Sequence, residues 1–163
     1  MISYQWANYL LSIIMTIEEL KTITEARLNS ASLLIEKKDW FFAAYTMAMA
    51  LECALKAAIC KTLNLNSYPE NIKNQKIVNF FWTHEFEQLR ILAGLNATFS
   101  PNTGITEVVQ NWGNFTIEFA GDWSKIRYDY ERQRQFDRTK VERLYNMLNH
   151  TENGIITKIK EIW

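Results

Sequence analysis

The residues best suited to chemistry lie in one stretch, GDWSKIRYDYERQRQFDRTK, at residues 121–140. Seven Lys or Arg and four Asp or Glu fall between Lys125 and Arg143, although the whole chain has a formal net charge of zero. An Arg guanidinium can hold a phosphate in bidentate fashion, and an aromatic ring can stack on a base. The pattern indicates either a local phosphate-binding site or a solvated connection between helices. The candidate ligand-binding residues are Lys125, Arg127, Tyr128, Tyr130 and Arg132.

Three further charged residues occupy apolar surroundings: Arg27 lies inside the apolar arc of the first predicted helix, and Glu52 and Lys56 are the interior charges of the second. Glu52 and Lys56 have the i,i+4 spacing in the favourable order on a helix. Because buried charges must be paired, we predict that the three form a structural polar cluster within the fold. His84 follows Thr83, a predicted helix cap, and this position favours a capping or surface-packing role.

Motifs of the common enzyme classes are missing from the sequence. The chain has two His, neither at a spacing that zinc ligands use, and it lacks Gly-rich phosphate loops, nucleophile elbows and the HExxH pattern. We therefore predict no metal site and no cofactor.

Length and composition predict one soluble domain. The 163 residues are 48% hydrophobic and 22% charged, as in ordinary globular proteins. Cys53 and Cys60 are too far apart on one helix for a disulfide, which suits a reducing cytoplasm. The start of the chain carries no charge, but its longest apolar run is too short to span a membrane. We expect an uncertain extension at residues 1–14 and a single domain at residues 15–163.

Apolar residues recur at helical spacing along most of the chain, and no segment alternates as a strand would. The predicted fold class is all-α, an antiparallel bundle of four to five main helices. Asp39 is the predicted N-cap of an almost completely apolar helix, and Gly94 is a predicted helix terminator. The expected helices cover residues 17–37, 40–63, 84–94, 105–120 and 137–162, the last with a weak point at Gly154; residues 64–76 are expected to be irregular.

Three stretches in order resemble one known family, the HEPN domains. RLNSASLLIEKKDWFFAAYTMAMALECALKAAI is similar to that family's two leading helices, with an Ala-rich Glu…Leu-Lys-Ala pattern. THEFEQLRILAGL resembles its Thr-His-x-Leu-x-x-Leu helix, and NWGNFTIEFAGDWSKIRYDY resembles its Trp-rich helix ending in Arg-Tyr. The similarity runs from about Glu18 to the C-terminus.

The resemblance implies a helical bundle that dimerises and is often encoded beside a minimal nucleotidyltransferase. Family members bind nucleotides or act as metal-independent ribonucleases that use an Arg and a His a few residues later. Arg127 matches the Arg position, but residues 128–141 contain no His. Arg143 and His150 have the longest spacing that the family motif allows, and we expect them two turns apart in the middle of the last helix.

Two main hypotheses follow from these patterns. The first is a HEPN-like binding module, a homodimer that holds a nucleotide, RNA or a partner protein such as a minimal nucleotidyltransferase through the Arg127 region. The alternative is a metal-independent endoribonuclease toxin of a toxin–antitoxin or defence system, using Arg143 and His150 or an unconventional partner such as Tyr128. A structural adaptor without a small ligand is a third reading.

Overall fold

The computed structural model of the protein describes residues 15–69, 75–101 and 106–163. The regular elements in these ranges are helices, as predicted, and their one β-type pairing is an isolated bridge between Thr16 and Ser67. The expected extension at residues 1–14 lies outside the described residues. In chain order the helices are α2 (Ile17–Glu36), α3 (Trp40–Thr62), α4 (Gln75–Phe81), α5 (Phe86–Leu92), α6 (Asn96–Phe99), α7 (Glu107–Glu118), the 3-10 helix η2 (Trp123–Tyr128), α8 (Tyr130–Gln133), α9 (Arg138–Asn149) and α10 (Ile155–Lys160).

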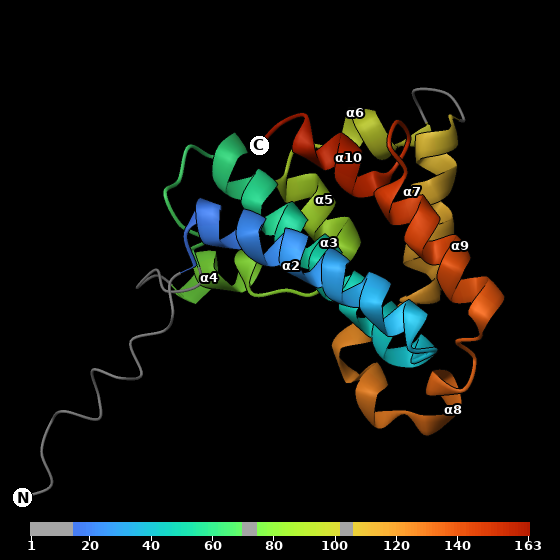
Figure 1. The fold of residues 1–163 in the computed structure, drawn as a ribbon. Helices are drawn as coiled ribbons and strands as arrows, with labels where there is room; N and C mark the ends of the chain where they lie inside the picture. Colours follow the sequence, from blue (N-terminus) through green and yellow to red (C-terminus); the bar gives the residue numbers. More distant parts are fainter. Residues whose placement is uncertain (1–14, 70–74, 102–105) are drawn as a thin grey trace, which may run out of the picture.

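Helices α2 and α3 form an antiparallel hairpin that runs along the fold (Figure 1). Thr16 begins α2 with a capping box that includes Glu19, so two backbone N–H groups of the first turn find acceptors. The Asp39 carboxylate accepts a hydrogen bond from the Phe42 N–H at 3.4 Å, as expected of the N-cap of α3. Between the helices Lys38 adopts a φ of 61°, and the chain reverses within a few residues.

Helix α3 is buried around most of its circumference, as its apolar sequence predicts. Leu51 and Leu55 are fully buried, and helices α2, α5, α9 and α10 all pack against α3. Small side chains let these neighbours approach closely, and the buried alanines of α3 are Ala43, Ala44, Ala48, Ala50, Ala54, Ala57 and Ala58. Within the described ranges α3 is also the one helix whose length and composition would suffice to cross a membrane, and most of it is buried inside the fold.

The basic segment is folded onto one end of the bundle, where α2 ends and α3 begins (Figure 1). Trp123 and Ile126 are buried and anchor η2 to the core. The Arg132 guanidinium donates to the carbonyl oxygens of Glu118 and Ala120, each at 3.4 Å. These oxygens lie at the C-terminal end of α7, where the helix dipole favours a positive charge. Arg132 therefore fixes the segment to the bundle.

The C-terminal region contains two helices where one was predicted. Asp137 caps α9 as expected, because its carboxylate accepts from the Lys140 N–H at 2.8 Å. Helix α9 then ends at Asn149, and α10 begins after Gly154. A Cβ at Gly154 would lie 2.5 Å from the backbone N and O of His150, so only glycine fits this turn. The expectation that His150 lies in the middle of a helix is therefore wrong.

The middle of the chain is more helical than predicted. Helices α4 and α6 were not expected, and α5 begins at Phe86, two residues later than its predicted start. Thr83 does not cap α5, because its hydroxyl accepts instead from the Glu85 N–H at 3.1 Å. Gly94 has a φ of 72° just after α5, in agreement with its predicted role as a terminator.

Candidate functional site

A cavity of about 250 Å³ opens beside the basic segment, between α3, η2 and the connection from α4 to α5. We call it the Arg127 cavity. It is lined by Tyr45, Met49, Glu52, Cys53, His84, Trp123, Ser124 and Arg127.

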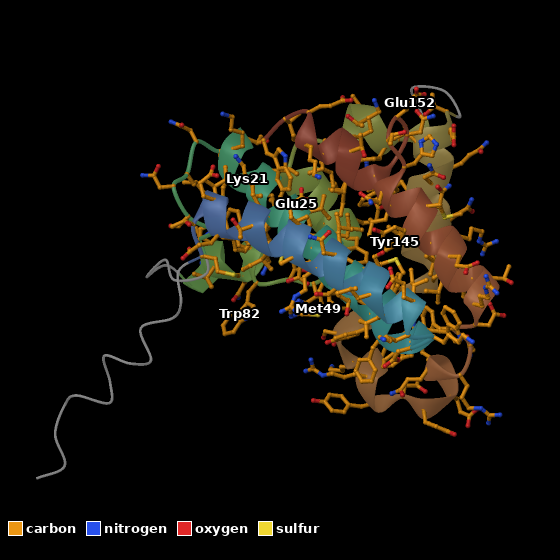
Figure 2. The ribbon with its side chains drawn as sticks, viewed as in Figure 1. Lys21, Glu25, Met49, Trp82, Tyr145 and Glu152 are labelled. Atoms are coloured by element: carbon orange, nitrogen blue, oxygen red, sulfur yellow. The ribbon has the colours of Figure 1, made fainter. Side chains whose placement is uncertain are left out.

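Helix α3 supplies one wall of the Arg127 cavity because its contributing residues share one side. Tyr45, Met49 and Cys53 follow each other at intervals of four residues, which places them in one row along the helix. These three are half-buried, whereas most of α3 around them is fully buried. Met49 is labelled in Figure 2. In the middle of α3, this row is therefore the side that is directed away from the core and toward the cavity.

The Arg127 guanidinium is held by aromatic residues. Its Nη1 donates to the Tyr45 hydroxyl at 2.8 Å, and its Cζ lies 4.9 Å from the centre of the Tyr128 ring. The Arg127 carbonyl oxygen accepts from the Gln133 Nε2 at 2.8 Å, so α8 fixes the backbone as well. Arg127 is itself exposed and, within the described residues, makes no salt bridge. Its charge and several of its N–H groups are available to a ligand.

Trp123 connects the three elements around the cavity. Its indole Nε1 donates to the His84 carbonyl oxygen at 2.8 Å, and its ring lies edge-on to the His84 imidazole at 6.1 Å between centres. The Tyr45 ring lies 5.5 Å from it on the α3 side, and the Phe86 ring stacks on it at 5.7 Å. This buried aromatic contact sets the position of His84 relative to Arg127.

His84 contributes an imidazole to the cavity. Its Nδ1 lies 2.8 Å from Oε2 of Glu52, whose other oxygen Oε1 lies 3.1 Å from the Lys56 ammonium. The pKa of His84 is raised above its usual value, chiefly by the hydrogen bond to Glu52 and further by the charges of Glu52 and Asp122. Burial and the charge of Lys56 oppose this rise.

The pair of Glu52 and Lys56 is buried, as predicted, but Arg27 does not belong to it. Arg27 lies on the exposed side of α2 and makes no salt bridge among the described residues. A long Arg side chain at the edge of an apolar stripe can reach water, which explains why spacing alone was misleading. His84 takes the third place in the cluster that was predicted for Arg27.

Most other cations of the basic segment are already neutralised. Lys125 pairs with Asp122 at 2.8 Å, and this contact, together with the Ser124 hydroxyl, lowers the pKa of Asp122 to about 2. The remaining pairs join Arg138 to Glu142 at 2.8 Å, Lys140 to Glu118 at 2.9 Å and Arg143 to Glu118 at 3.7 Å. Arg134 lies 5.7 Å from the centre of the Tyr130 ring. Like Arg132 and Arg134, Arg127 makes no salt bridge among the described residues, and it differs from both in lining the cavity.

The other predicted ligand-binding residues lie around the cavity but do not line it. Tyr128 and Tyr130 have 77% and 68% of their surface exposed, so their rings are open to solvent. Lys125 is exposed and Arg132 is used in anchoring the segment to α7. Of these four, Tyr128 is the one in contact with Arg127.

Arg143 and His150 are not brought together in one site. Arg143 faces Glu118 on α7, whereas His150 ends α9 and its Nδ1 accepts from the Asn153 N–H at 3.2 Å and the Glu152 N–H at 3.3 Å. Both contacts are with backbone groups of the turn that follows α9. Arg143 and His150 therefore each contact other groups of the protein, and no contact between the two is seen among the described residues.

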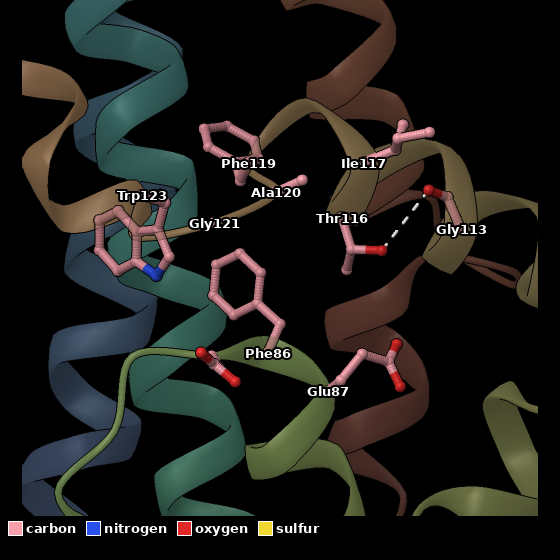
Figure 3. A pocket seen from close by; sticks show the side chains of 10 residues that line it. Phe86, Glu87, Gly113, Thr116, Ile117, Phe119, Ala120, Gly121 and Trp123 are labelled. Atoms are coloured by element: carbon pink, nitrogen blue, oxygen red, sulfur yellow. Dashed lines mark hydrogen bonds between the residues drawn. The ribbon is translucent and has the colours of Figure 1, made fainter. Parts of the chain in front are cut away.

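A second cavity, of about 390 Å³, lies on the far side of Trp123 (Figure 3). Figure 3 shows the Trp123 and Phe86 rings on one side and Ile117 and Thr116 on the other. The Glu85 and Glu87 carboxylates also line it. Because carboxylates repel phosphate, this second cavity does not suit an anionic ligand.

Sequence reasoning did not identify His84 or Tyr45 as residues of the site. They come from segments far from Arg127 in the chain, and no short-range spacing can relate the three. The Thr-His stretch of the family resemblance was the only available pointer to His84. Among the described residues, no group of three His, Cys, Asp or Glu side chains is arranged to hold a metal ion.

No family model, curated protein or solved structure matches this chain. Its function is therefore inferred from the geometry of the Arg127 cavity.

Proposed function

We propose that the protein is a HEPN-like binding module that holds a nucleotide or RNA through its Arg127 region. One observation carries the proposal: the guanidinium of Arg127 is held by the Tyr45 hydroxyl in a cavity and makes no salt bridge among the described residues, whereas four other cations of the segment are paired with carboxylates, namely Lys125, Arg138, Lys140 and Arg143. A fixed guanidinium without a carboxylate partner is suited to bind phosphate, since its planar fork matches two phosphate oxygens.

The aromatic residues near Arg127 support a ligand that also carries a base. Tyr128 contacts the guanidinium and is open to solvent, so a base could stack on its outer face while the phosphate lies at Arg127. Stacking of this kind is tolerant of base identity and contributes about 1–3 kcal/mol per base. We expect affinity for adenine nucleotides and for single-stranded RNA with little sequence preference.

The experiment is a titration of the pure protein with labelled oligonucleotide and with ATP at low and high salt. Affinity should fall with salt, because charges at an exposed site are screened over about 8 Å at physiological ionic strength. Arg127→Ala should weaken binding far more than the matched control Arg138→Ala, whose side chain pairs with Glu142 on an exposed helix face. Equal effects of the two changes would reduce the segment to a generic charged surface. Absence of binding would favour a structural adaptor.

The homodimer implied by the HEPN resemblance belongs to the same proposal. If the basic segments of two copies face one cleft, their electrostatic fields add and attract a phosphate-bearing ligand more strongly. Light scattering coupled to size-exclusion chromatography should then give twice the monomer mass. A minimal nucleotidyltransferase is the partner protein that the resemblance suggests, and co-purification of the two proteins would test it.

A second candidate function, metal-independent RNA cleavage, gains support from the position of His84. The family's cleavage motif needs an Arg and a His, and His84 lies in the same cavity as Arg127. A His within reach of the reacting groups can give general acid/base catalysis, typically worth about 10²–10⁴-fold.

Incubation of RNA with pure protein in excess chelator tests this second function. Cleavage that is lost in His84→Ala and kept in His150→Ala would establish the cavity as its site. The opposite result would transfer the activity to Arg143 and His150. RNA that stays intact under all conditions would leave the binding module as the function of the site.

A further inference from the structure

His84 is the second group of the Arg127 cavity that can carry a positive charge near neutral pH. Its Nδ1 is engaged with Glu52 at 2.8 Å, and 48% of its side-chain surface is exposed. Within the described residues its Nε2 makes no hydrogen bond. An ionised Glu52 holds the proton on Nδ1, so Nε2 accepts hydrogen bonds when the ring is neutral and donates one when it is protonated. Only the protonated ring can donate to a phosphate oxygen.

Charged groups face His84 from each element that packs against it. Helix α3 contributes Glu52 and Lys56, whose charges offset each other at 3.1 Å. The start of η2 contributes Asp122, which is offset by Lys125. Glu85, the next residue in the chain, lines a different cavity from the one that contains Arg127. A protonated His84 shares Glu52 with Lys56, so these three groups together carry one net positive charge, which adds to the charge of Arg127.

The size of the cavity limits what it can enclose. At about 250 Å³ it is smaller than the roughly 300–1,000 Å³ of sites that enclose a small molecule. Its walls include the rings of Tyr45 and Trp123, which are held in place by contact with each other. A phosphate group with part of its sugar fits such a volume better than a whole nucleotide or a continuous chain.

We propose that the Arg127 cavity binds a terminal phosphate monoester, with the Arg127 guanidinium and the protonated His84 imidazole as its two cationic donors. The inference rests on the function proposed above. A monoester carries about 1.5 to 2 negative charges at pH 7 and three free oxygens, so it can face two cations at once. An internal phosphodiester has a single charge and two free oxygens, and it would also have to pass its chain through the cavity.

The experiment compares 5′-AMP with the dinucleotide ApA, which contains one internal phosphodiester and no terminal phosphate. Calorimetric titrations are made with each ligand from pH 5 to pH 9. We expect 5′-AMP to bind about tenfold or more tightly than ApA, the usual effect of one additional charged hydrogen bond. Its affinity should be greatest near neutral pH. It should fall below about pH 6, where the monoester dianion takes up a proton and becomes a monoanion, and fall again at higher pH as His84 loses its proton.

The chain provides its own matched control, because it contains two His. His84→Gln should lower 5′-AMP affinity about tenfold and remove the high-pH decline, whereas His150→Gln should change neither. Far-ultraviolet circular dichroism of both variants verifies that the helices are intact. Imidazole proton resonances give a readout without substitution, since 5′-AMP should raise the pKa of His84, whereas the His150 resonances should not move when the ligand is added.

The outcomes separate this inference from the proposed function. Equal affinity for 5′-AMP and ApA, or a His84→Gln variant with the wild-type pH profile, would overturn the inference and leave the proposed function in place. Failure of the wild-type protein to bind any of the ligands would overturn both. A preference for 5′-AMP that depends on His84 and on pH as described would support it.

Discussion

Two regions of this molecule each contain an Arg and a His, and they differ in how those residues are used. Arg143 and His150 are near each other in the sequence, but Arg143 pairs with Glu118 and His150 accepts backbone N–H groups in the turn after α9. Arg127 and His84 are far apart in the sequence, yet both line one cavity. The difference is that the second pair shares a cavity, and that Arg127, unlike Arg143, makes no salt bridge among the described residues.

The comparison teaches that proximity in sequence and availability in space are independent properties. A side chain whose charge and hydrogen bonds are satisfied by the protein gains little from a ligand, because binding must first break those contacts. Glu52 orients His84 through one ring nitrogen and leaves the other one open. The backbone N–H groups after α9 donate to the Nδ1 of His150 instead.

The largest expected effect on stability comes from truncating a core residue of α3, the helix that forms one wall of the Arg127 cavity. Leu55 is fully buried at the centre of α3, and Leu55→Ala should lower the free energy of unfolding by about 2–5 kcal/mol. The control is Leu33→Ala, since Leu33 is 58% exposed and its change should stay within about 0.5 kcal/mol. Urea titrations followed by circular dichroism measure both. A small effect at Leu55 would contradict the central position of α3.

Removing each Arg and His pair in a separate variant gives the most direct test of the comparison. The double variant Arg127→Ala/His84→Ala should lose about a hundredfold or more in nucleotide affinity, because two charged hydrogen bonds are removed at about 1.5–3 kcal/mol each. The double variant Arg143→Ala/His150→Ala removes the same residue types and should lose less than about twofold, since distant exposed charges are screened. Fluorescence anisotropy with a labelled oligonucleotide that carries a free 5′-phosphate gives both values. Similar losses would break the comparison.

The salt dependence of RNA binding should distinguish the two Arg residues more finely. Removing one phosphate contact is expected to reduce the slope of log affinity against log salt by about one. Arg127→Ala should show this reduction, and Arg143→Ala should keep the wild-type slope. The measurement is a series of binding titrations at salt concentrations from about 50 to 200 mM, the range over which such slopes are commonly resolved.

The smallest effect concerns stability and pH. Because folding raises the pKa of His84, its contribution to stability is fully present below the unfolded value of about 6.5 and is lost as pH rises through the folded pKa. Wild-type protein should therefore lose a small amount of stability between pH 5.5 and pH 8.5. His84→Gln should remove that loss and His150→Gln should retain it. Urea midpoints at the two pH values provide the test, and identical profiles for all three proteins would contradict it.

The sequence predicted the long helices well because their signals are local. The apolar pattern of α2 and α3, the Asp39 cap and the Gly94 terminator each act within a few residues, and the structure confirms them. Helix α4 was missed because it has seven residues and few buried positions, too short for a clear period. The break before α10 was predicted only as a weak point. It depends on the close approach of Gly154 to the His150 backbone, which a linear pattern does not reveal.

The candidate site was predicted in part. Arg127 was identified from its residue type and its surroundings in the sequence, which are local properties. The interaction of His84 with Glu52, and of Tyr45 with Arg127, depends on how α3 packs beside η2 and on the position of Trp123. Such contacts are long-range, so single-sequence periodicity cannot give them. Arg27 shows the converse error, because an apolar surrounding in the sequence did not make it buried.

Helix α3 has two kinds of residue on separate sides, those of the core and those of the cavity wall. Its buried residues, such as Leu51 and Leu55, support the whole fold, while the row of Tyr45, Met49 and Cys53 faces the Arg127 cavity. In a saturation-mutagenesis library, the positions at which substitutions reduce ligand binding without reducing cellular abundance should therefore recur every four residues along this helix. Variants of the cavity row should remain abundant and lose the ligand, so that natural drift could alter what this protein recognises without endangering its ability to fold.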